Sequence, residues 1–105
     1  MAWILLIIAG VLEVVWAYAM KLSNGFTQTT PTLVTAMAMV GSVVLLAIAM
    51  RTIPLGTAYV IWTGIGAIGT FLVGIIWLGE ALTPLRLTAA VLIISGLLLL
   101  KWAEN

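Results

Sequence analysis

Residues 2–20 read AWILLIIAGVLEVVWAYAM, and this stretch decides the fold class. It holds one charged residue, Glu13, among aliphatic, aromatic and small side chains. A helix of about 20 mostly apolar residues crosses the roughly 30 Å hydrocarbon layer of a bilayer. We therefore predict a transmembrane helix over residues 2–20. Because the stretch lacks a basic leading segment and carries Glu13, we expect it to be retained rather than cleaved as a signal peptide.

The composition of the whole chain indicates a membrane protein. Of its 105 residues, 65% are hydrophobic and 7% are charged, whereas soluble proteins usually carry about 25% charged residues. These proportions exclude a water-soluble enzyme and a disordered chain. A net charge of +1 argues against a nucleic-acid partner. The chain has neither His nor Cys, so we expect no zinc site built on imidazole or thiolate, no disulfide and no thiol chemistry. We also expect no cofactor.

Three further apolar stretches are long enough to span a bilayer. They cover residues 32–50, 57–78 and 85–102, and short clusters of polar and turn-forming residues separate them. Connections this short leave no room for a soluble domain. We predict an all-α integral membrane protein in which residues 1–105 form one domain of four transmembrane helices.

The basic residues favour neither orientation of the chain in the membrane. Arg51 and Lys101 fall on the side of the N-terminus, and Lys21 and Arg86 fall on the other. Orientation follows the bias of Lys and Arg in short loops, and here there is none. We expect the chain to insert both ways round. The alternative is that the N-terminal amine or the insertion machinery selects one orientation.

Glu13 is the one charge expected inside the hydrocarbon, because Glu80 and Glu104 fall at predicted helix ends. A carboxylate at that depth costs a few kcal/mol and usually faces a cavity or a partner on an ion path. No Lys or Arg lies at mid-span, so its counter-charge is a proton or an external cation. The alternative is a protonated glutamate that makes a hydrogen bond between helices.

Residues at helical spacing extend the candidate site around this glutamate. Gly10 and Trp16 share its face of the first span, where glycine leaves space and the indole offers a π face to a cation. In the second span Met39 and Ser42 share one helix face, and in the third span Tyr59 and Trp62 share another. The predicted site-lining residues are Gly10, Trp16, Met39, Ser42, Tyr59 and Trp62.

Residues 64–69 read GIGAIG and match the dinucleotide-binding pattern G-x-G-x-x-G. That motif requires a βαβ unit and a later acidic residue, which the sequence does not predict here. In a transmembrane helix such glycines permit close helix approach or a kink. We expect Gly64 and Gly66 to form a hinge, and Ala89 and Gly96 to pack against another helix in a dimer.

Two segments resemble the small multidrug resistance family: residues 10–17, GVLEVVWA, and residues 55–67, LGTAYVIWTGIGA. The resemblance covers the whole chain, including its loop positions. Trp16, three residues after the glutamate, with Ser42 and Tyr59, resembles the guanidinium-exporter subtype. The resemblance implies an antiparallel, dual-topology homodimer in the bacterial inner membrane, which exchanges protons for a cation at paired glutamates.

The resemblance also implies roles for individual residues. Glu13 of each subunit would bind the proton or the cation, Ser42 and Trp62 would orient its carboxylate, and Tyr59 would switch partners between subunits. The expected function is proton-coupled export of guanidinium or small guanidinyl cations. The protein would then be a secondary active transporter and not an enzyme.

Three alternatives remain at this stage. One is a broader exporter of quaternary ammonium and other hydrophobic cations, which cannot all donate N–H bonds. Another is a rotary proteolipid, which would need a ring and a lipid-facing carboxylate. The third is a structural subunit without transport activity, in which Glu13→Gln would be harmless.

Overall fold

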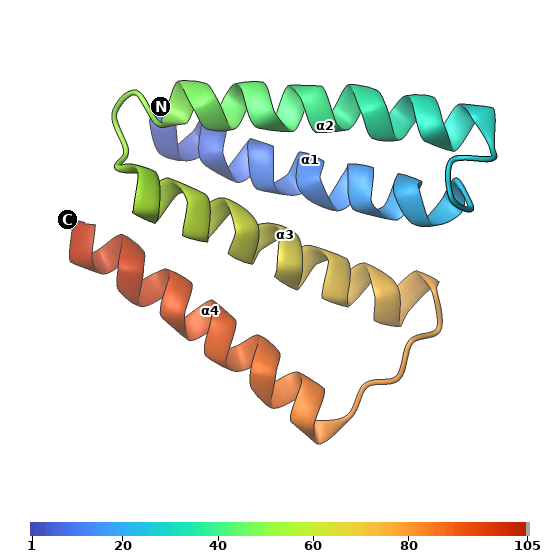
Figure 1. Ribbon diagram of the computed structural model, residues 1–105. Helices are drawn as coiled ribbons and strands as arrows, with labels where there is room; N and C mark the ends of the chain where they lie inside the picture. Colours follow the sequence, from blue (N-terminus) through green and yellow to red (C-terminus); the bar gives the residue numbers. More distant parts are fainter. Residues whose placement is uncertain (105) are drawn as a thin grey trace.

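The computed structural model describes residues 1–104, which form four helices and no strand (Figure 1). Helix α1 spans Ala2–Leu22, α2 spans Thr29–Ala49, α3 spans Leu55–Trp77 and α4 spans Pro84–Glu104. All four are long and apolar enough to cross a membrane. The predicted all-α class with four helices of membrane length is confirmed. The side chain of Glu104, expected in reach of water, lies outside the described residues.

Helix α1 extends further than predicted, to Leu22 rather than residue 20. Ser23 ends it by donating its N–H to the Ala19 carbonyl (2.9 Å) and its hydroxyl to the Met20 carbonyl (2.6 Å). Gly25 then adopts a left-handed backbone conformation, with φ of +70°. A serine that satisfies two late carbonyls lets the helix run its full length before the turn.

Helices α2 and α3 also begin earlier than predicted. Helix α2 begins at Thr29 rather than at residue 32, with Pro31 in its first turn. Proline fits there because the N–H it lacks would have no partner within the helix. Helix α3 begins at Leu55 rather than at residue 57, directly after Pro54, whose carbonyl accepts the Ala58 N–H (2.9 Å).

The boundaries at the α3–α4 connection differ from the prediction by one residue each. Helix α3 ends at Trp77 rather than residue 78, and α4 begins at Pro84 rather than residue 85. The Thr83 hydroxyl accepts the N–H of Arg86 (3.1 Å) and so satisfies a free donor at the start of α4. The backbone of α4 continues to residue 104 rather than 102.

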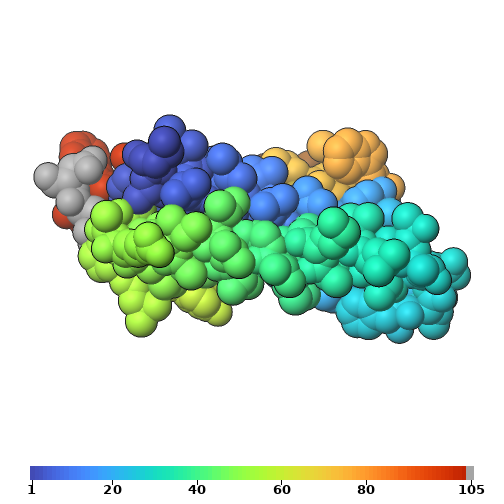
Figure 2. All heavy atoms as spheres, turned by 90° about the horizontal axis from the view of Figure 1, so that it is seen from above, coloured from blue at the N-terminus to red at the C-terminus, as the bar shows by residue number. Residues whose placement is uncertain are grey.

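Helix α1 lies at the centre of the packing. It contacts both α2 and α3, whereas the backbone of α4 comes near α3 alone. Figure 1 shows α4 diverging from the other helices, and Figure 2 shows the outer face of α2 along the length of the molecule. Among the described side chains of α4, only Ala90 is buried. Much apolar surface on α4 therefore faces outward.

The buried core gathers toward the end of the bundle near the N-terminus and the α2–α3 connection. Its members are Leu6, Ala9, Leu46, Ala49, Ile53, Ala58, Ile61 and Trp62. The opposite end, where α1 ends and the α3–α4 connection runs, contains a hollow of about 440 Å³. The buried core thus lies at one end of the bundle and this hollow at the other, which we call the open end.

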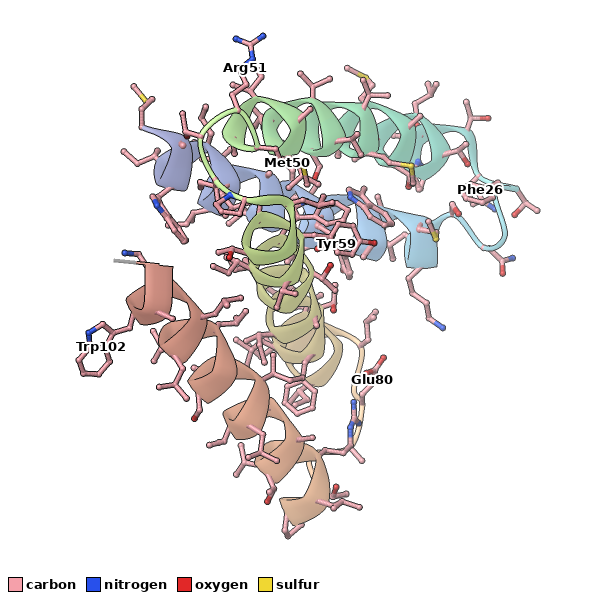
Figure 3. The ribbon with its side chains drawn as sticks, turned by 60° about the vertical axis from the view of Figure 1, so that its left-hand side comes forward. Phe26, Met50, Arg51, Tyr59, Glu80 and Trp102 are labelled. Carbon is pink, nitrogen blue, oxygen red and sulfur yellow. The ribbon has the colours of Figure 1, made fainter. Side chains whose placement is uncertain are left out.

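The four basic residues lie at both ends of the bundle. Lys21 and Arg86 line the hollow at the open end. At the other end, the Lys101 ammonium lies 4.8 Å from the ring centroid of Trp3, and Arg51 follows α2 on the connection beside the N-terminus (Figure 3). Each end therefore carries two basic residues, as the sequence pattern predicts.

Candidate functional site

Glu13 lies midway along α1, and its carboxylate contacts the backbone of Gly66 on α3. A Cβ atom at position 66 would overlap the Glu13 carboxyl group. Oε1 of Glu13 is buried and has no hydrogen-bond partner within the described chain. A buried acceptor without a partner is costly, so this oxygen is suited to receive a proton or a donor from a bound cation.

Trp16 follows one turn later on the same face of α1, as its spacing predicts. Its indole Nε1 is also buried and has no hydrogen-bond partner within the described chain. A donor and an acceptor thus remain unpaired near each other at mid-membrane. Buried polar groups are usually hydrogen-bonded, so these two atoms are candidates for contact with a bound ligand.

Ser42 of α2 joins three helices through its hydroxyl group. It is fully buried, donates to the carbonyl of Ala9 on α1 (2.7 Å) and accepts the indole N–H of Trp62 on α3 (2.9 Å). One bond joins Ser42 to Ala9 and the other joins Trp62 to Ser42, and neither reaches the carboxylate of Glu13. The predicted orienting role of Ser42 and Trp62 stays a prediction, and the structure connects them to α1 through Ala9.

Tyr59 and Met39 are less buried than Ser42 and Trp62. The Tyr59 side chain is 52% exposed, its ring centroid lies 5.5 Å from that of Trp62, and it lines a groove between α3 and α4 (Figure 3). Met39 is half-buried on α2, one turn before Ser42. The structure thus places the ring of Tyr59 beside that of Trp62. That Tyr59 changes partners between subunits stays a prediction.

The glycines of the site are positions where helices approach closely. A Cβ at Gly10 would lie 2.6 Å from the side chain of Ile65, and one at Gly64 would lie 2.5 Å from that of Leu97. Helix α3 runs unbroken through Gly64 and Gly66. Close approach is therefore what the structure displays at these glycines, and the hinge stays a prediction.

The predicted packing residues on α4, Ala89 and Gly96, are both exposed. A Cβ at Gly96 would meet nothing within 4 Å. Gly96 lines the same groove of about 540 Å³ between α3 and α4 as Tyr59. An exposed small residue on an apolar helix leaves room for a partner, and the predicted dimer contact remains a prediction.

The hollow at the open end approaches the glutamate from one side of the membrane. Its walls include Ala17, one turn after Glu13 on α1, and Ala67, which follows Gly66 on α3. Its rim carries Lys21, Glu80 and Arg86. The only ion pair among the described residues joins Arg86 to Glu80 on this rim, at 3.5 Å. No described basic side chain pairs with Glu13.

Sequence reasoning missed two contributors. The carbonyl of Ala9 receives the Ser42 hydroxyl, and Gly69 leaves room for Val14, since a Cβ there would overlap its side chain. The small pair Ala9-Gly10 before the glutamate was a usable signal, because small residues let helix backbones come close enough for such a bond.

Comparison with known proteins agrees with this geometry. The family model described as Small Multidrug Resistance protein matches residues 1–102. The chain belongs to the small multidrug resistance family. Curated relatives from Citrobacter freundii and Escherichia coli K12, each named "Guanidinium exporter", are 52% identical over 105 residues, which is the full length of both chains. A relative of the same name from Yersinia pestis is 52% identical over 104 residues, 99% of this chain and 100% of its own.

Membership of this family, together with the four helices of membrane length, indicates where the protein is located. The protein is an integral, multi-pass protein of the bacterial inner membrane. Its curated relatives are named as exporters, which is consistent with a transporter.

Proposed function

We propose that this protein exports guanidinium in exchange for protons, by alternating access at Glu13 of two antiparallel copies of the chain. The observation that carries the proposal is the unpartnered Oε1 of Glu13 at mid-membrane against Gly66. The names of its 52%-identical relatives support guanidinium as the cation.

The carboxylate of Glu13 gives a physical reason why proton movement and cation movement would be coupled. Within the described residues it has no basic partner, so charge neutrality in hydrocarbon requires either a proton or a cation at the same oxygen atoms. The two cannot occupy the carboxylate together. A proton that enters down its gradient displaces the cation on one side, and a cation that binds on the other side displaces the proton.

Guanidinium suits this site better than a quaternary ammonium ion. It is planar and gives a carboxylate two parallel N–H···O bonds, while the π face of Trp16 attracts cations of either kind. A quaternary ammonium ion has no N–H to give to the unpaired Oε1. We therefore place guanidinium and small guanidinyl cations ahead of hydrophobic quaternary ammonium ions as substrates.

The outward apolar surface of α4 and the balanced charges support the antiparallel homodimer. Helix α4 buries only Ala90 among its described side chains, and two basic residues lie at each end of the bundle. Chains inserted in opposite directions would present identical sites to both sides of the membrane. Exchange of conformation between the two copies then gives equivalent inward-open and outward-open states.

The residues around Glu13 would hold the carboxylate while the helices move. The Ser42 hydroxyl joins α2 to Ala9 of α1 and to Trp62 of α3, so these three helices would move together and carry Glu13 with them. Tyr59, at the groove beside α4, would change partners as the second copy moves. Gly64 and Gly66 would allow α3 to bend.

Transport by purified protein in liposomes tests the proposal. We expect an outwardly directed proton gradient to drive uptake of labelled guanidinium, and excess unlabelled guanidinium to compete better than tetramethylammonium. Glu13→Gln should abolish uptake, whereas Gly56→Ala, at a position where a Cβ would meet nothing within 4 Å, should retain exchange. Unchanged uptake by Glu13→Gln, or stronger competition by tetramethylammonium, would overturn it.

A further inference from the structure

The guanidinium group of Arg86 occupies a small, well-defined environment at the mouth of the hollow. It donates one N–H to the carbonyl of Ala81 and another to Oε1 of Glu80 (3.5 Å). Its central carbon lies 5.1 Å from the ring centroid of Phe71. A carbonyl, a carboxylate and an aromatic face are the groups that bind a planar, delocalised cation.

The carboxylate of Glu80 is positioned by the backbone rather than by Arg86. The N–H of Glu80 donates to the carbonyl of Gly74 (3.0 Å), and a Cβ at Gly74 would overlap the Glu80 carboxyl group. Gly79 makes the turn between them with φ of +69°, a conformation that favours glycine. The acceptor would therefore remain in place without the arginine side chain.

The ion pair between Arg86 and Glu80 is exchangeable. The two side chains are 39% and 44% exposed, and their closest N···O distance is 3.5 Å. Exposed pairs of this kind contribute about 0–1 kcal/mol to stability. A free cation of the same shape can therefore compete with the Arg86 side chain for Glu80.

The position of this pair connects it to the site at mid-membrane. Glu80, Arg86 and Phe71 all line the hollow that reaches Ala17, one turn from Glu13. Figure 3 shows Glu80 on the α3–α4 connection, away from the end of the bundle that carries Arg51. A cation that moves between this side and Glu13 through the hollow passes Glu80.

We propose that Glu80, Phe71 and the carbonyl of Ala81 form an outer guanidinium-binding site, which the side chain of Arg86 occupies and a free guanidinium ion displaces. The inference rests on the proposed function for the identity of the ligand. In an antiparallel dimer, one such site lies at each surface of the membrane. Arg86 thereby covers the site when no substrate is present.

Binding of guanidinium chloride, measured by calorimetry on full-length protein in detergent, tests the inference. All variants carry Glu13→Gln, which removes the carboxylate at mid-membrane. Adding Arg86→Ala should strengthen guanidinium binding about tenfold, since it frees a charge-assisted acceptor. Adding Glu80→Gln to that variant should remove the gain, and tetramethylammonium, which has no N–H, should not show it.

Lys21→Ala in the same Glu13→Gln background is the matched control. It removes one positive charge from the same rim and leaves Glu80 covered. An equal gain from Lys21→Ala, no gain from Arg86→Ala, or a gain that persists with Glu80→Gln would overturn the outer site. If Arg86→Ala does not fold, Arg86→Gln takes its place. Because every variant lacks the Glu13 carboxylate, failure here leaves exchange at Glu13 intact, and failure of exchange leaves this binding intact.

Discussion

The carboxylate of Glu13 lies directly against the backbone of Gly66, so the glycine makes the space that the carboxylate uses. Neither residue could change size without moving the other. The relationship joins α1 to α3 at mid-membrane and places an unpaired acceptor oxygen there.

Gly66→Ala should therefore impair guanidinium transport. The added methyl group overlaps the Glu13 carboxyl group, and alanine is favoured over glycine within a helix by about 1 kcal/mol, so the fold should persist. We expect uptake into liposomes to fall at least about tenfold, an effect of about 1.4 kcal/mol. Gly56→Ala is the control on the same helix, because a Cβ at Gly56 would meet nothing within 4 Å. Equal uptake by both variants would contradict the role of this contact.

Ser42→Ala should destabilise the protein. The substitution leaves the buried indole N–H of Trp62 without an acceptor and the carbonyl of Ala9 without the hydroxyl donor. The free energy of unfolding should fall by about 1–3 kcal/mol. The measurement is thermal or denaturant unfolding in detergent. The control is Ser95→Ala, at an exposed position of α4. A double-mutant cycle with Trp62→Phe should show coupling of about 0.5–3 kcal/mol, and strictly additive effects would contradict the bond between them.

Guanidinium binding should release protons and strengthen as the pH rises. A protonated Glu13 must lose its proton before the cation binds, so over the range where Glu13 is mostly protonated the apparent affinity should rise about tenfold per pH unit, by linkage. Calorimetry in buffers of different ionisation enthalpy counts the protons released. Glu13→Gln should release none, and proton release by that variant would assign the coupling to another group.

Reporters fused to the C-terminus should be active in both compartments. Two basic residues at each end give no orientation bias. Gln28→Lys adds a charge on the side of Lys21 and should shift the population so that this side faces the cytoplasm. Activity in one compartment alone for the unchanged chain would contradict dual topology.

Hydropathy and charge position were sufficient to predict the four helices and the depth of Glu13. Both are local properties, because a span needs a run of apolar residues and a single charge stands out within it. Helix ends were less accurate: Pro31 lies inside the first turn of α2, and Ser23 extends α1, through hydrogen bonds that composition does not display.

Contacts between helices could not be predicted in detail. Helical spacing placed Ser42 and Trp62 on faces of their own helices but did not reveal that Ser42 bonds to the carbonyl of Ala9. A backbone carbonyl carries no signal in the sequence. Likewise, the sequence placed Glu80 only at a helix end and Arg86 only on the side of Lys21, whereas the turn at Gly79 brings their side chains together beside Phe71.

The most direct test of the account is proton movement driven by guanidinium. Liposomes with purified protein are loaded with guanidinium, diluted into guanidinium-free buffer without a pH gradient, and followed with an internal pH dye. The account predicts that the interior acidifies as guanidinium leaves and protons enter, and that Glu13→Gln shows no change. Guanidinium efflux without acidification, or acidification that persists with Glu13→Gln, would contradict exchange at this glutamate.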